Sequence, residues 1–193
     1  ARRITEEELQ ALDQLVAGLL DAGALPDERA IREPEMVAYQ PTPGRAILDL
    51  LERADIRAHD LLIDLGAGLG WVVILVALLS EARTVGVEFE PTYCEYARSC
   101  AAAVNASRAS FVLADAREAS LANATIFFLY TPFRGEMLQQ VLGRLRAEAL
   151  LRPIRVCTYG PCTPEVATAR WLTPRGVSDF RDFREDEVVV FDS

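Results

Sequence analysis

Hydrophobic and polar positions divide the chain into a helical start and a longer region in which strands and helices alternate. From residue 61 onward, short apolar runs alternate with segments of helical periodicity. The predicted strands are Leu61–Leu65, Thr84–Glu88, Ser110–Ala114, Ala124–Tyr130 and Ile154–Tyr159. The predicted helices are Leu69–Leu79, Pro91–Val104 and Gly135–Ala149. Because these strands are apolar on both faces, the pattern predicts a buried parallel sheet in a doubly wound, Rossmann-like α/β fold.

The end of the chain departs from this alternation. Ala169–Thr173 and Glu187–Phe191 are predicted to be two further strands, joined through the polar loop Arg181–Asp186. We expect them to pair antiparallel at one edge of the sheet. The predicted sheet is therefore seven-stranded and mostly parallel, with an antiparallel hairpin at its C-terminal end.

Two helices are predicted before the sheet. The first begins at a capping box, Thr5 with Glu8, and ends at Gly23. Its apolar face is formed by Leu9, Leu12, Val16, Leu19 and Leu20. Residues 24–42 contain three prolines and are predicted to be irregular, after which Thr42 is expected to cap the next helix with Pro43 in its first turn. We therefore divide the chain into an N-terminal helical extension, residues 1–42, and a domain, residues 43–193.

Composition and charge narrow the classes of function. The 193 residues carry a formal net charge of −9, and every one of the 20 basic residues is arginine. Because phosphate backbones repel an acidic chain, nucleic acid is a disfavoured partner. The longest apolar stretch, Val72–Leu79, is too short to cross a bilayer, and no secretory segment opens the chain, so we expect a cytoplasmic protein without a membrane span. Four cysteines without a C-x-x-C pair and a single histidine, His59, disfavour a metal site.

A glycine-rich loop follows the first predicted strand in "LLIDLGAGLGWVVILVALL", residues 61–79. Ligands of doubly wound sheets bind beyond the carboxyl ends of the strands, where this loop lies. Gly66, Gly68 and Gly70 permit positive φ and a close approach of a ligand to the backbone, and the following helix points its positive end to the same place. A dinucleotide fingerprint needs a third small residue where this chain has Trp71. The loop is instead G-x-G-x-G, preceded by Asp64.

At these residues the sequence resembles the class I S-adenosylmethionine-dependent methyltransferases. "DLGAGLG" is similar to their first motif, whose loop passes under the methionine and ribose of the cofactor while its acid, here Asp64, orders the loop or meets the ammonium group. The resemblance implies that Glu88 accepts hydrogen bonds from the ribose hydroxyls. It also implies that Asp115 faces the adenine amino group and that Ala116 lines the adenine pocket. The implied cofactor is S-adenosylmethionine, the implied product is S-adenosylhomocysteine, and no metal is implied.

One branch resembles the chain more closely over residues 36–159, namely the non-SET histone lysine methyltransferases and their relatives. The similar segments are "YQPTPGRAILDLLE", "GWVVILVA", "GVE" and "NATIFF". In that family a hydroxyl near the first segment bonds the methionine carboxylate, which makes Thr42 the first candidate here and Tyr39 the second. A plain helix cap remains the alternative for Thr42.

The tip of the fourth strand, "IFFLYTPFRGEM", is where such enzymes place the acceptor. Adenine amino-methyltransferases carry Asn or Asp, two prolines and an aromatic residue there, and this chain lacks the leading Asn or Asp. Tyr130 would stabilise an ammonium by cation–π contact or accept a hydrogen bond, and Phe133, Tyr39 and Trp71 would complete an aromatic mouth. Plain packing is the alternative for each of these residues. His59 precedes the first strand, so a histidine general base is not expected.

The predicted function is in-line methyl transfer to an acceptor amine, such as a protein lysine side chain. Two alternatives stay open: a small-molecule methyltransferase, and a non-catalytic protein that binds S-adenosylmethionine. A nicotinamide oxidoreductase is disfavoured by Trp71. The expected partners are thus the cofactor and a protein or small-molecule acceptor.

Overall fold

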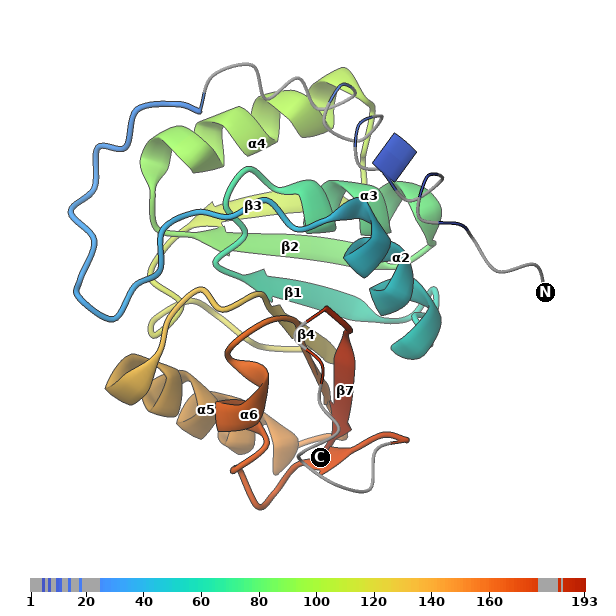
Figure 1. Cartoon of the computed structure of the whole chain (residues 1–193), viewed down its shortest axis with the longest axis vertical. Helices are drawn as coiled ribbons and strands as arrows, with labels where there is room; N and C mark the ends of the chain where they lie inside the picture. Colours follow the sequence, from blue (N-terminus) through green and yellow to red (C-terminus); the bar gives the residue numbers. More distant parts are fainter. Residues whose placement is uncertain are drawn as a thin grey trace.

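The computed structural model describes residues 25–176, 184 and 186–193, together with residues 5, 7, 10, 11, 14 and 18. Within these residues the centre of the molecule is one seven-stranded sheet of order β3-β2-β1-β4-β5-β7-β6 (Figure 1). Its strands are β1 (Leu61–Leu65), β2 (Arg83–Glu88), β3 (Ala109–Leu113), β4 (Ile126–Leu129), β5 (Arg155–Thr158), β6 (Thr173–Pro174) and β7 (Val189–Asp192). Strands β1 to β5 are parallel, β7 is antiparallel to β5, and β6 is antiparallel to β7. The predicted doubly wound fold is confirmed.

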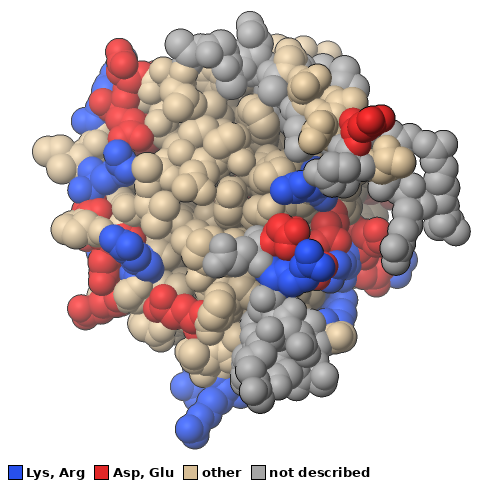
Figure 2. All heavy atoms as spheres, viewed as in Figure 1, with Lys and Arg blue, Asp and Glu red and all other residues tan. Residues whose placement is uncertain are grey.

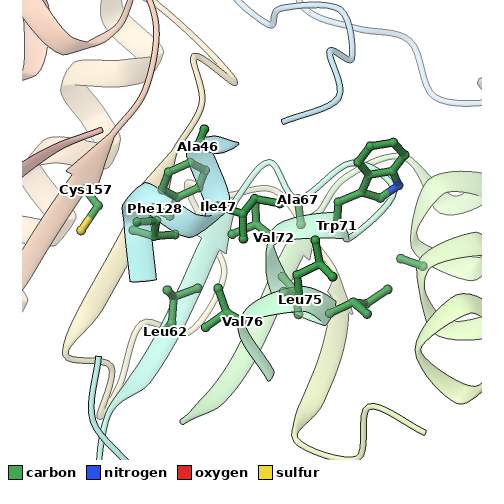
Figure 3. Close-up of a cluster of buried hydrophobic side chains, with 14 of the residues drawn as sticks. Ala46, Ile47, Leu62, Ala67, Trp71, Val72, Leu75, Val76, Phe128 and Cys157 are labelled. Atoms are coloured by element: carbon green, nitrogen blue, oxygen red, sulfur yellow. The ribbon is translucent and has the colours of Figure 1, made fainter. Parts of the chain in front are cut away.

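Helices cover both faces of the sheet and form two apolar cores (Figure 1). The first core lies under α2 (Gly44–Arg53), α3 (Trp71–Leu79) and α4 (Pro91–Ala103), and the second under α5 (Gly135–Ala149) and the short α6 (Thr163–Val166). Figure 3 shows Ile47 of α2 and Val72 of α3 packed with Leu62 of β1. Because α3 is enclosed by the sheet and its neighbouring helices, its residues from Trp71 to Ala77 are all buried, which explains why this helix lacks a polar face.

The first five strands and the three helices between them begin and end within two residues of their predicted bounds. The prediction for the end of the chain is partly wrong. The segment from Ala169 to Leu172, predicted as part of a strand, forms turns after α6. Strand β6 begins only at Thr173 and has two residues. Pro174 cannot donate a ladder hydrogen bond, so this edge strand ends at once. The second strand of the antiparallel pair begins at Val189 rather than at Glu187.

The predicted start of α2 is wrong by one residue. The helix begins at Gly44, with Pro43 as the N-cap, and the backbone N–H of Ala46 donates to the carbonyl of Pro43 at 2.9 Å. The hydroxyl of Thr42 therefore has no capping role, although its side chain is buried. Of the predicted first helix, residues 7, 10, 11, 14 and 18 are described and are helical. Glu8, the five apolar positions and Gly23 lie outside the described residues, as does most of the loop Arg181–Asp186.

No helix in the described part of the chain is long and apolar enough to span a membrane. The division at residue 42 stays a prediction.

Candidate functional site

A cleft opens at the carboxyl ends of β1 to β4. Its walls come from the loops that follow these strands, from the first turns of α3 and α4, and from the segment before α2. The predicted site residues that line it are Tyr39, Thr42, Asp64, Gly66, Gly68, Glu88, Asp115, Ala116, Tyr130 and Phe133. Gly70 is the predicted site residue that does not line it. One cleft thus brings together residues from five separate segments.

The glycine loop is shaped by positive φ angles, +86° at Gly66, +54° at Gly68 and +84° at Gly70. Side chains of the protein itself occupy the space beside each glycine. A Cβ on Gly66 would clash with Pro132, and one on Gly68 would clash with the ring of Tyr39. A Cβ on Gly70 would lie 2.6 Å from the ring of Phe111. The expectation that the glycines mainly clear space for a ligand is therefore incomplete, because they also let the loop pack tightly.

Glu88 ends β2 and holds the glycine loop in place. Its Oε2 accepts a hydrogen bond from the backbone N–H of Gly68 at 2.7 Å, and its Oε1 accepts one from Glu90 N–H at 2.8 Å. The side chain is 5% exposed, and burial raises the pKa of the carboxyl although the backbone hydrogen bonds oppose this. Each carboxylate oxygen can accept a second hydrogen bond. Glu88 is therefore both a structural tie and an acceptor available to a ligand.

Asp64 is the last residue but one of β1 and is the unpaired acid of the cleft among the described residues. Its side chain is 3% exposed, and no residue in the described part of the chain donates a hydrogen bond to it. Burial, followed by the nearby charge of Glu88, raises the pKa of Asp64 to about 8. Because a buried carboxylate needs a partner, a cationic ligand group beside Asp64 would favour its charged form.

Two hydroxyl groups share this part of the cleft. Tyr39 covers Gly68, and its ring lies 5.4 Å from the ring of Tyr93 in an edge-on arrangement. Burial and neighbouring acids raise the pKa of Tyr39, so its hydroxyl stays protonated and can donate. Thr42, freed from capping, also lines the cleft. Both candidates for a carboxylate contact are therefore brought to the same end as Asp64.

The carboxylate of Asp115, at the end of β3, is already paired. Arg117 donates to it from its backbone N–H at 2.7 Å, from Nε at 3.0 Å and from Nη2 at 2.6 Å. The same guanidinium also pairs with Glu33. These hydrogen bonds from Arg117 lower the pKa of Asp115. Asp115 reaches the cleft as a rigidly held carboxylate.

The segment before α2, residues 27–42, crosses the carboxyl edge of the sheet; we call it the strap (Figure 1). Glu90 holds its first part, because this carboxylate accepts hydrogen bonds from the backbone N–H groups of Arg29 at 2.9 Å and Ala30 at 2.7 Å. Burial opposes the charge of Glu90, yet these bonds and those from Thr92 lower its pKa to about 2. Tyr93 donates to Glu28 at 2.9 Å and adds a second tie to α4.

The second part of the strap is tied to β4 and α5. Glu35 accepts hydrogen bonds from the backbone N–H groups of Glu136 at 3.0 Å and Met137 at 2.8 Å, in the first turn of α5. The N–H of Val37 donates to the carbonyl of Pro132 at 3.0 Å. Sequence reasoning missed these roles. The available signal was the row of acids among the prolines of residues 24–42, but their partners lie 60 or more residues away.

The tip of β4 forms the remaining wall. Tyr130 donates a hydrogen bond to Oε1 of Gln40 at 3.2 Å, and its ring lies 4.8 Å from that of Tyr159. Thr131 has a φ of +43°, which is strained for a β-branched residue, and its hydroxyl accepts from the N–H of Cys162 at 3.1 Å. Strained backbone of this kind occurs most often at functional sites.

The four aromatic residues expected to form one mouth are divided between two places. Tyr39 packs on the glycine loop, and Trp71 begins α3 beside it. Tyr130 pairs instead with Tyr159, and Phe133 is 5% exposed and packs in the second core. His59 is exposed and precedes β1, away from the cleft. In the described part of the chain, no group of three or more His, Cys, Asp and Glu side chains is arranged to hold a metal ion.

Comparisons with known proteins agree with this geometry. A family model described as "Histone methylation protein DOT1" matches residues 37–113, less than half of the chain. No match was found among curated proteins. The chain is 28% identical to an RNA methyltransferase from Salinibacter ruber whose crystal structure holds S-adenosyl-L-homocysteine. That match covers 79% of this chain and 92% of the other, with a TM-score of 0.56.

Two further solved structures share the fold at low identity. An rRNA methylase from Streptococcus thermophilus is 9% identical, with 81% of this chain and 98% of that one covered and a TM-score of 0.54. A geranyl diphosphate methyltransferase solved with GPP and sinefungin is 13% identical, with 78% and 76% covered and a TM-score of 0.55. The family match and the Salinibacter ruber structure together support a class I S-adenosylmethionine-dependent methyltransferase. The family match spans Tyr39, Asp64 and Glu88 and ends before β4. It therefore supports the half of the cleft formed by β1 and β2 and gives no information on the half formed by β4.

Proposed function

We propose that the protein binds S-adenosylmethionine in the cleft and transfers its methyl group to an amine, with a lysine side chain of another protein as the favoured acceptor. The observation that carries this proposal is the unpaired, buried Asp64 on the same cleft as Tyr130. The ammonium group of the cofactor would pair with Asp64, and the ammonium group of the acceptor would contact the ring of Tyr130.

In the proposed complex the two ends of the cofactor meet different residues. The ammonium group pairs with Asp64, and the carboxylate takes hydrogen bonds from Thr42 and Tyr39. The ribose hydroxyls donate to Glu88, whose oxygens retain acceptor capacity. The adenine lies against Ala116 with its amino group toward Asp115. Gly66 and Gly68 form the floor, while Gly70 shapes the loop from outside the cleft.

The mechanism requires little chemistry from the protein. S-adenosylmethionine supplies an activated methyl group, so the chain contributes by holding the nucleophile in line with it and by excluding water. Tyr130 attracts the ammonium form of the acceptor with its ring. Its hydroxyl, anchored by Gln40, fixes the orientation of that ring. Phe133 supports the tip of β4 from the core.

The acceptor class follows from charge and from the β4 tip. A chain with net charge −9 attracts basic protein segments and repels phosphate backbones. On the face viewed in Figure 2, acidic and basic side chains of described residues alternate around an uncharged centre and form no continuous basic patch. RNA is the second candidate, because the Salinibacter ruber neighbour, 28% identical over most of its length, is an RNA methyltransferase.

The test is transfer of tritiated methyl from S-adenosylmethionine to three acceptors: a lysine-rich basic protein, total RNA and small amines. The chain contains no lysine, so any methyl-lysine recovered comes from the acceptor. We expect label in the protein acceptor, lost with Glu88→Ala. Tyr130→Phe should retain most of the rate, because it keeps the ring, and Tyr130→Ala should lose it. Label in RNA alone would establish the second candidate, and tight binding without transfer to any acceptor would indicate a non-catalytic binding protein.

The domain division is also a proposal. We propose that residues 1–42 form an extension whose last part, the strap, closes the cleft of the domain formed by residues 43–193. The tie of Glu90 to the strap and the tie of Glu35, in the strap, to α5 support this arrangement.

A further inference from the structure

Trp71 presents a polar group that the fold leaves without a partner. The residue is the first of α3, lines the cleft, and is 9% exposed. In the described part of the chain its indole Nε1–H is buried and has no hydrogen-bond acceptor. Figure 3 shows the indole projecting away from the other labelled side chains of the first core.

An unpaired buried donor is a costly feature. Leaving such a group without an acceptor costs about 1–3 kcal/mol, and about nine in ten buried polar groups in proteins are paired. Packing alone does not explain an indole here, because Phe or Leu would fill a core position without burying an N–H. The indole can only donate, so its missing partner is an acceptor. Because Trp71 lines the cleft, a ligand bound there can supply that acceptor.

The chemistry of that acceptor follows from the neighbouring acid. Asp64 lines the same cleft, is also buried, and has no hydrogen-bond donor to its side chain among the described residues. The cleft therefore carries one unpaired donor and one unpaired acid close to the glycine loop. An α-amino acid group, with an ammonium and a carboxylate on one carbon, satisfies both at once. A carboxylate is also the stronger acceptor beside the positive N-terminal end of α3.

We propose that Trp71 is a specificity-determining residue that donates its indole N–H to the carboxylate of the bound cofactor, so that the cleft selects S-adenosylmethionine over its decarboxylated form. This inference rests on the proposed binding of S-adenosylmethionine in the cleft. It adds a criterion that Asp64 alone does not supply, since the decarboxylated form keeps the ammonium and loses the carboxylate.

The experiment compares three ligands on two proteins by calorimetry. The ligands are S-adenosylhomocysteine, decarboxylated S-adenosylmethionine and 5′-methylthioadenosine, which lacks the amino-acid end. Trp71→Phe keeps an aromatic ring but removes the N–H together with one ring of the indole. A loss of packing should affect all three ligands alike, so we expect S-adenosylhomocysteine to be weakened about tenfold more than the other two. Trp171→Phe, at the other tryptophan and outside the cleft, is the matched control and should change none of them.

The outcomes separate this inference from the proposed function. An equal loss for all three ligands would mean that the indole only packs, and no loss for S-adenosylhomocysteine would mean that its N–H has another partner; either result overturns the inference. If wild-type protein bound none of the ligands, the proposed function itself would fail. Thermal unfolding of Trp71→Phe shows whether the variant is folded, and Trp71→Tyr, tested in the same way, provides a second variant that lacks the indole N–H.

Discussion

The two halves of the cleft differ in how completely the protein satisfies its own polar groups. In the half formed by the ends of β2 and β3, the carboxylates of Glu88, Glu90 and Asp115 all accept hydrogen bonds from backbone groups or from Arg117. In the half formed by β1 and the start of α3, the side chains of Asp64 and Trp71 have no hydrogen-bond partner among the described residues.

This difference separates preorganisation from recognition. Groups that are already paired lose little freedom when a ligand arrives, so the first half can hold a nucleoside rigidly. Groups without partners make a ligand necessary, because their burial is compensated only when it binds. We therefore expect substitutions in the first half to affect all ligands alike, and substitutions in the second half to discriminate between them.

The largest expected effect is at Glu88, which belongs to both the loop and the ligand. Glu88→Ala removes the acceptor for the Gly68 N–H and the proposed ribose contact, so S-adenosylhomocysteine should bind at least about 100-fold more weakly. Methylthioadenosine should lose the same factor. Calorimetry measures both, with Glu95→Ala on the exposed side of α4 as the control. Unequal losses of affinity for the two ligands would contradict the expectation that the half of the cleft formed by β2 and β3 affects all ligands alike.

Gly68 tests whether the loop is rigid because of close packing. Gly68→Ala places a Cβ against Tyr39 at a φ of +54°, so it should lower the free energy of unfolding by about 1–3 kcal/mol and weaken binding of every ligand. Gly143→Ala, in α5 with nothing within 4 Å of the added Cβ, should instead raise it by up to about 1 kcal/mol. Urea unfolding of both variants shows whether each substitution lowers or raises the free energy of unfolding. Equal effects would show that the loop is not tightly packed.

Asp64 should make the second half sensitive to pH. Its folded pKa of about 8 lies above the ordinary value, so the free protein binds a proton there that an ammonium ligand must displace. The affinity for S-adenosylhomocysteine should rise from about pH 6 to about pH 7.5 by up to tenfold per unit. Methylthioadenosine should show no such slope, and Asp64→Asn should abolish it.

The same raised pKa has the opposite effect on the stability of the free protein. Between about pH 4 and about pH 8 the folded state binds this proton more tightly than the unfolded state does, so its contribution to stability falls as pH rises. Chemical unfolding of wild type and Asp64→Asn across this range measures the difference. If the contribution of Asp64 to wild-type stability increased with pH, the raised pKa of this residue would be contradicted.

The smallest effect is expected at the strap. Glu33→Gln removes the charge that pairs with Arg117 but leaves Asp115 paired, so release of S-adenosylhomocysteine should accelerate only about two- to fivefold. Stopped-flow tryptophan fluorescence measures this rate, because Trp71 lies in the cleft. Glu118→Gln, an exposed neighbour with the same charge change, is the control. A similar acceleration in both variants would mean that the loss of one negative charge, and not the loss of the ion pair between Glu33 and Arg117, changes the release rate.

Local signals account for what could be predicted from the sequence. The alternation of apolar runs fixes β1 to β5, and the glycine loop with Asp64 and Glu88 indicates the cleft. These features depend on neighbouring residues and on strand ends that a parallel sheet brings together. The strap could not be predicted, because its ties, such as Glu35 to α5, join residues about 100 positions apart. The missing partner of Trp71 is likewise visible only in three dimensions.

Because of the strap, the part of the chain needed for folding is expected to be shorter than the part needed for ligand binding. All seven strands, and helices α2 to α6, lie after residue 42. We therefore expect a chain that began at Pro43 to retain the sheet and the buried residues of both cores. It would lack Glu28, Glu33 and Glu35, which tie the strap to the rest of the fold. It would also lack Tyr39, whose ring covers Gly68 of the glycine loop. The backbone N–H groups at the start of α5 would then face solvent. Hydrogen exchange at Glu136 and Met137 thus reports whether a shortened chain, however well folded, still has a closed cleft.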